Sequence, residues 1–251
     1  MIERPRSAGK WHRAMHYVAS CGCVLLLAGC GGAEFGQDAR VPAGERYILA
    51  AGSPAGASLN LPADRPFNIH VKQSSQDQGP TGTATSRSDA TPDGKAFARA
   101  ETADGGSAKA EFKIGHRIDN TTAATHMMSL DISFNLRQEI AASDVPAPAT
   151  LAKAYLVLAV IDSHKRAVSN TVVVQGTSDD ARGEAAFPQQ RHLTVRLEPG
   201  ESYDVVLFGL VESAAGEDQR AAARIEVEGL QMALAFTPTP GASESAPAAA
   251  R

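Results

Sequence analysis

The strongest constraint on the fold is a two-residue repeat in the positions of the apolar side chains. Its longest example alternates with polar residues and consists of Met128, Leu130, Ile132, Phe134 and Leu136. Shorter examples occupy residues 67–71, 108–114, 193–197 and 230–236. Successive side chains of a β-strand point to opposite faces, so this period predicts strands with one buried face. With roughly ten such segments separated by turn residues, the sequence predicts an all-β fold, a single antiparallel β-sandwich that is jelly-roll-like or immunoglobulin-like.

One interruption of the repeat predicts a local irregularity. The last apolar run, residues 230–236, is out of phase with Ile225 and Val227. A strand cannot shift by one residue without turning its apolar face to water. Gly229 lies at the change of phase, so the sequence predicts a β-bulge there.

Three segments predict reversals of the chain. Asp104-Gly105-Gly106 is typical of a hairpin turn, and residues 162–166 lie between two apolar strands as a hairpin loop. Residues 213–224 have the composition of a helix, but they lack an apolar stripe and contain Gly216. We expect a long hairpin loop in that segment, with a helix as the alternative.

The first 29 residues have the features of a secretory signal. Residues 1–16 carry four basic side chains and one acidic side chain, and residues 17–29 carry no charge. A membrane-spanning helix needs about 20 apolar residues. The uncharged stretch is too short for that and matches the apolar region of a signal peptide.

The uncharged stretch ends in Leu27-Ala28-Gly29-Cys30. This motif resembles the lipobox of bacterial lipoproteins, and the resemblance covers only this end of the chain. It implies cleavage before Cys30, a diacylglyceryl thioether on its sulfur and acylation of its new amino group. Several acyl chains hold a protein at a membrane, whereas one gives marginal anchoring.

The residue after the cysteine indicates which membrane the lipoprotein is anchored in. In such lipoproteins of enteric bacteria an Asp there retains the protein in the inner membrane, and this chain has Gly31. The resemblance therefore implies anchoring in the outer membrane, facing either the periplasm or the outside. The alternative is ordinary cleavage after Ala33, which would release a free protein.

Composition divides the chain into four regions. We expect a lipoprotein signal peptide at residues 1–29, a lipidated flexible tether at 30–46, the β-sandwich domain at 47–236 and a disordered tail at 237–251. Cys21 and Cys23 leave with the signal, and lipid occupies the sulfur of Cys30. The mature domain would then have neither a disulfide nor a thiol catalyst.

Two predicted strands, residues 154–161 and 205–211, are apolar on both faces. In a two-sheet sandwich only one face of each strand meets the core. In each strand, either one set of alternate residues or the set of their neighbours would therefore point outward. The first set is Leu156, Leu158 and Val160 in one strand, and Val206, Phe208 and Leu210 in the other. Either the chain covers this surface itself, with residues 47–51 or 145–153, or a partner protein or a second copy docks there.

Catalytic, cofactor-binding and metal-binding motifs are not found, and we expect no cofactor. The tightest polar cluster, residues 116–120 with His126, is predicted to be a strand end and turn, with a metal or proton-transfer site as the alternative. Asp179, Asp180 and Glu184 offer oxygen atoms suited to calcium, although a solvated loop is the preferred interpretation.

Charge and aromatic content argue against two classes of ligand. Removal of the first 29 residues takes away four of 24 basic and one of 28 acidic side chains and leaves a net charge of −7, which disfavours nucleic acid. The single tryptophan, Trp11, leaves with the signal, which argues against a carbohydrate site. We therefore expect a non-enzymatic envelope module that contacts another protein. The alternative is a carbohydrate-binding or polysaccharide-processing domain, and processing would need two carboxylates about 5–9.5 Å apart.

Lipidation can be tested by metabolic labelling. Cells given radiolabelled palmitate should incorporate label into the wild-type protein, and Cys30→Ala should abolish it because the acceptor sulfur is gone. Cys23→Ala, within the signal, should keep the label. An unlabelled wild-type protein would show that Cys30 is not an anchor.

Overall fold

The computed structural model describes residues 41–54, 56–143, 150–178 and 183–239. These residues form twelve strands and one short 3-10 turn, η2 (Ala43–Glu45). The strands are β1 (Tyr47–Leu49), β2 (Ala57–Leu61), β3 (Ile69–Gln78), β4 (Thr83–Ala90), β5 (Ala96–Ala103), β6 (Gly106–Asn120), β7 (His126–Ala142), β8 (Leu151–Asp162), β9 (Ala167–Thr177), β10 (Gly183–Leu197), β11 (Ser202–Ala215) and β12 (Arg220–Pro238). Within these ranges, no helix is long and apolar enough to cross a membrane. The predicted all-β class is confirmed.

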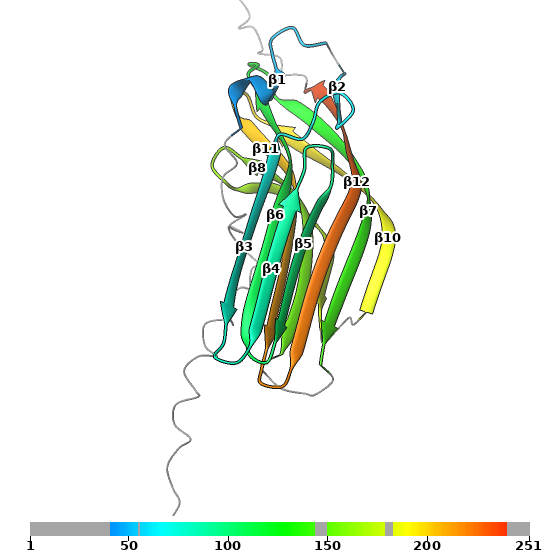
Figure 1. The fold of residues 1–251 in the computed structure, drawn as a ribbon. Helices are drawn as coiled ribbons and strands as arrows, with labels where there is room; N and C mark the ends of the chain where they lie inside the picture. Colours follow the sequence, from blue (N-terminus) through cyan, green and yellow to red (C-terminus); the bar gives the residue numbers. More distant parts are fainter. Residues whose placement is uncertain (1–40, 55, 144–149, 179–182, 240–251) are drawn as a thin grey trace, which may run out of the picture. The chain divides into compact units, whose positions relative to one another are not determined.

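The strands form two six-stranded sheets that pack face to face (Figure 1). Sheet A has the order β1-β6-β11-β8-β9, with β3 also beside β6. Sheet B has the order β10-β7-β12-β5-β4, with β2 also beside β12. The pairing is antiparallel except between β1 and β6, which run parallel. The predicted antiparallel sandwich is therefore confirmed, with one short parallel addition.

The pairing is nested. β8 pairs with β9, β7 with β10, β6 with β11 and β5 with β12. A long two-stranded ribbon that folds over itself gives this pattern, because its successive strand pairs fall alternately into the two sheets. Of the two topologies left open by the sequence, the fold is therefore a jelly roll.

Two of the predicted hairpin connections differ in the structure, because the strands that they join belong to different sheets. Asp104 and Gly105 have positive φ angles of 56° and 97°, as a tight turn requires, but they join β5 of sheet B to β6 of sheet A. The predicted hairpin is thus a corner between sheets. Residues 213–224 form neither a long loop nor a helix, because β11 continues to Ala215 and β12 begins at Arg220. Residues 162–166 do close a hairpin, between β8 and β9.

The predicted core positions are buried between the sheets. Met128, Leu130 and Leu136 of β7 have at most 1% exposure and belong to the main apolar cluster. Leu234 and Phe236 of β12 join the same cluster from the neighbouring strand. Apolar burial of this kind is the main favourable term in folding.

The structure decides which faces of β8 and β11 point inward. Leu156, Leu158 and Val160 are fully buried in the main cluster. Val206 is fully buried in a second cluster, whose other members are Val41, Ile69, Val157, Ala159 and Ile161. Phe208 is 8% exposed and Leu210 is half-buried. The six residues predicted as a partner surface thus do not form one exposed face, and that prediction is wrong.

The segment before β1 belongs to the folded domain. Val41 is 4% exposed and packs in the second cluster, although residues 30–46 were expected to form a tether. Tyr47–Leu49 were expected to lie across the outer sheet, but they form β1 at the edge of sheet A. Of the other candidate cover, residues 145–153, residues 145–149 lie outside the described residues, and residues 151–153 belong to β8.

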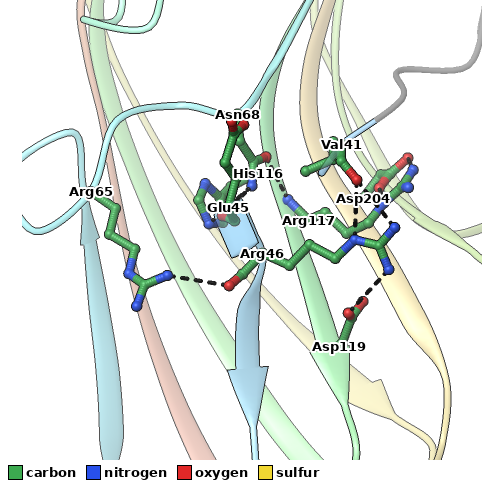
Figure 2. Close-up of polar contacts among 9 residues, drawn as sticks. All are labelled: Val41, Glu45, Arg46, Arg65, Asn68, His116, Arg117, Asp119 and Asp204. Atoms are coloured by element: carbon green, nitrogen blue, oxygen red, sulfur yellow. Dashed lines mark hydrogen bonds and ion pairs between the residues drawn. The ribbon is translucent and has the colours of Figure 1, made fainter. Parts of the chain in front are cut away.

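Polar contacts hold this segment in place (Figure 2). Nε and a terminal nitrogen of Arg46 donate to the carbonyl of Val41, at 3.3 and 3.1 Å, and the guanidinium pairs with Asp119 at 3.4 Å. The side-chain amide of Asn68 donates to the carbonyl of Glu45 at 2.8 Å. These bonds satisfy the backbone carbonyls of a segment that has almost no sheet pairing of its own.

A buried histidine lies beside these contacts. His116 is 1% exposed, and its Nε2 lies 3.3 Å from the amide nitrogen of Asn68 (Figure 2). Burial, and then the positive charge of Arg65, lower the pKa of His116 from 6.5 to about 4. The folded protein therefore holds this imidazole in its neutral form.

This burial predicts a loss of stability in mild acid. Between about pH 6.5 and pH 4 the unfolded chain binds a proton at His116 and the folded chain does not, so the free energy of unfolding should fall by about 3 kcal/mol in total as pH decreases. Urea unfolding at several pH values measures this slope. His116→Gln should flatten it, whereas His70→Gln, which changes an exposed histidine of β3, should not. An unchanged slope in His116→Gln would refute the assignment.

Candidate functional site

An open groove of about 760 Å³ lies on the outer face of sheet B. It crosses β10, β7 and β12 and reaches β2 on the far side. Its polar lining consists of Asn60, Asp131, Ser133, Gln190, Arg191, His192 and Gln231. These residues are brought together by strand pairing rather than by a loop.

Small side chains make this part of the sheet hollow. Ser133 and Ala233 lie on the two central strands of the groove, β7 and β12, where they point away from the core. Pro62 and Ala63, which follow β2, stand on one side, and His192 of the edge strand β10 stands on the other. The inward neighbours Ile132 and Met232 are buried, so the same two strands build both the core and the groove.

His192 and Asp131 are directly opposite each other on β10 and β7. His192 Nδ1 lies 2.8 Å from Asp131 Oδ1, and His192 Nε2 lies 3.4 Å from the hydroxyl of Thr194. A hydroxyl, an imidazole and a carboxylate in this order also occur in nucleophilic triads. Such chemistry also needs backbone N–H donors aimed at the reacting carbonyl oxygen. Here β7 is paired on both sides and the edge strand β10 on one, and the side chains of these strands are hydrogen-bonding groups on the face of the sheet.

Asn60 is held by a neighbouring carboxylate. Its backbone N–H and its side-chain amide both donate to Asp64 Oδ2, at 2.7 and 3.1 Å. This fixes the side chain with its carbonyl oxygen available as an acceptor. Gln190 and Gln231 are exposed and add further amide donors and acceptors.

The carboxylates do not suit glycoside hydrolysis in this groove. Asp131 is the one acidic residue in its lining, as far as the described residues show. Hydrolysis by the usual two-carboxylate mechanism needs a second carboxylate across the scissile bond.

The predicted bulge lies at one end of the groove and is confirmed. The pairing of β12 with β7 shifts between Glu228 and Gln231, and Gly229 has a positive φ of 63°. A bulge bends its strand and strengthens the local twist. Gln231, the first outward residue after the bulge, lines the groove.

The polar cluster found in the sequence has structural contacts. Asn120 ends β6 and His126 begins β7, so the predicted strand end and turn are observed. The side-chain amide of Asn120 donates to the carbonyls of Ala124, Leu197 and Glu198. Among the residues that the structure describes, no group of three or more His, Cys, Asp or Glu side chains could hold a metal ion.

The other predicted positions are only partly described. Glu184 forms an ion pair with Arg137 at 3.4 Å. Asp179, Asp180 and Cys30 lie outside the described residues.

Sequence reasoning missed the groove because its side chains come from four strands. Asp131 and His192 are 61 residues apart, and each reads as a solvent-facing residue of its own strand. The available signal was the small size of outward residues on β7 and β12, namely Ser129, Ser133, Ala233 and Ala235.

The sequence matches no protein-family model and no curated protein. Among solved structures, a carbohydrate-binding module of the β-sandwich superfamily is similar at 14% identity over 63% of this chain and 55% of its own, with a TM-score of 0.25. The family 11 carbohydrate-binding module from Clostridium thermocellum, in complex with a β-1,3-1,4-mixed-linked tetrasaccharide, is similar at 11% identity over 70% and 96%, with a TM-score of 0.23. The infectious bursal disease virus Gx strain structure is similar at 13% identity over 74% and 38%, with a TM-score of 0.26. Likenesses this distant assign neither a family nor a ligand.

The bulge predicts a conformational test. Gly229→Ala should lower the free energy of unfolding by about 1 kcal/mol, because a Cβ atom disfavours a positive φ even where space is open. Gly229→Asn should cost less, since Asn adopts this region more readily. Urea unfolding compares the two variants. Equal stability of Gly229→Ala and wild type would show that the bulge does not need glycine.

Proposed function

We propose that the protein is a non-enzymatic binding module of the bacterial cell envelope, anchored through Cys30 in the outer membrane, and that its groove binds a neutral carbohydrate chain. One observation carries the proposal: an open groove of about 760 Å³ lined mainly by neutral hydrogen-bonding side chains. Asn60, Ser133, Gln190 and Gln231 can each donate and accept hydrogen bonds. Sugar hydroxyls have the same double capacity.

The lining predicts weak and selective binding. A net hydrogen bond contributes about 1 kcal/mol, so four or five of them correspond to a dissociation constant of roughly 1 mM. Asp64 holds Asn60, and Asp131 pairs with His192, which reduces the rotamer entropy lost when a ligand binds. The groove is thus preorganised for a polar ligand.

The two apolar strands give less support for a protein-interaction function than the groove gives for carbohydrate binding. Leu156, Leu158 and Val160 lie in the core, and Val206 is buried in the second cluster. The polar groove on the opposite sheet is a better candidate for ligand contact, because its functional groups are exposed. This shifts the preferred function from protein contact to carbohydrate binding.

Removing groove amides should weaken binding. We expect the full-length protein to bind at least one of barley β-glucan, xylan, galactomannan and dextran, and Gln231→Ala or Asn60→Ala to weaken that binding about fivefold each. Affinity gel electrophoresis measures the retardation. Gln175→Ala, which changes an exposed glutamine on β9 of the other sheet, is the matched control and should bind as wild type. Binding to none of the four polymers, or equal loss in the control, would overturn the proposed function.

A further inference from the structure

The outward residues that line the groove form two rows, and both rows run across the strands. In the first row, Asp131 of β7 is opposite His192 of β10 on one side and Ala233 of β12 on the other. Ala233 is in turn opposite Asn60 of β2. All four residues are exposed and line the groove. Strand pairing therefore produces one continuous row of outward side chains from β2 to β10.

The second row lies two residues away on the same strands. Ser133 of β7 is opposite Gln190 of β10 and opposite Gln231 of β12. Pro62 follows the last residue of β2 and extends this row on that side. The groove is thus bounded by two parallel rows that come from the same set of strands.

The groove is longer across the strands than along them. Neighbouring strands are about 4.8 Å apart, so the three steps from β2 to β10 span about 14 Å. The two rows are separated by about 7 Å, the distance between alternate residues of a strand. Between the rows on the central strands, Ile132 and Met232 are buried, so no side chain rises there. The long axis of the groove therefore lies at right angles to the strands.

Charged side chains lie beyond the second row in the strand direction. Arg137 of β7 pairs with Glu226 of β12 at 3.6 Å and with Glu184 of β10 at 3.4 Å. The β-bulge at Gly229 also interrupts the outward alternation of β12 between Glu226 and the second row. A neutral chain that continued along β7 would cover these ion pairs, and removing charges from water costs free energy. The sheet thus favours a neutral chain that stays between the two rows.

The two rows offer different hydrogen-bonding groups. The first contains the carboxylate of Asp131, which only accepts hydrogen bonds and lies 2.8 Å from Nδ1 of His192. The second contains Ser133, Gln190 and Gln231, which both donate and accept. A chain with hydroxyl groups along both edges can donate to the first row and exchange hydrogen bonds of either kind with the second. An anionic chain would instead place negative charge beside Asp131.

We propose that the carbohydrate chain lies across the strands from β2 to β10, with one hydroxyl-bearing edge facing the first row and the other facing the second. This inference rests on the proposed function of the groove. It adds the direction of the chain and assigns each of its edges to a set of side chains.

The direction of the chain can be tested by placing a large side chain either inside the groove or beside it. Ala233→Phe adds a ring to the middle of the first row, and we expect it to weaken binding about tenfold because the ring occupies the path of a crosswise chain. Asn135→Phe places the same ring on β7 beyond the second row, where only a lengthwise chain would pass, and it should bind as wild type. Affinity gel electrophoresis of the full-length protein measures both, with whichever of the four polysaccharides retards the wild type most.

Val172→Phe, at an exposed valine of β9 on the other sheet, is the control for an added exposed ring and should bind as wild type. Urea unfolding curves show whether each variant remains folded. Weakened binding by folded Asn135→Phe, or wild-type binding by folded Ala233→Phe, would overturn the crosswise direction, while losses in Gln231→Ala and Asn60→Ala would still support the groove. Failure of the wild type to bind any of the four polysaccharides would instead overturn the proposed function.

Discussion

The pairing of β7 with β12 is the interaction on which the rest of the structure depends. It runs from Ala221 opposite Ala142 to Pro238 opposite His126. The inward residues of the two strands form the centre of the main cluster, and their outward residues form the floor of the groove. Because side chains alternate across a strand, core and candidate site cannot change register independently.

Much of the fold could be predicted because local alternation reports one-sided burial. The core positions of β7 and β12 could be recognised from period two alone. Even the irregularity in β12 could be located, because the phase of Ile225 and Val227 disagrees with that of Leu230. A register that buries both groups needs an extra residue, and Gly229 tolerates the positive φ that the bulge imposes.

Other features were not predictable because they depend on contacts far apart in the sequence. Turn residues specify that the chain reverses, but not whether the next strand joins the same sheet, and Asp104-Gly105 therefore forms a corner. In β8 both parities are apolar, so the pattern does not decide that Leu158 faces the core and Ala159 the second cluster. Val41 is buried by that second cluster although its own neighbours in sequence are small and polar.

The candidate site could not be predicted from the sequence for the same reason. Its position on the face of a sheet determines which chemical groups it presents to a ligand. A groove on the face of paired strands has backbone N–H and C=O groups that are already used by the ladder, so only side chains meet a ligand. Such a surface can place neutral donors and acceptors at regular spacing along a strand. Long paired strands with small outward residues thus suit the contact with a polymer that we propose.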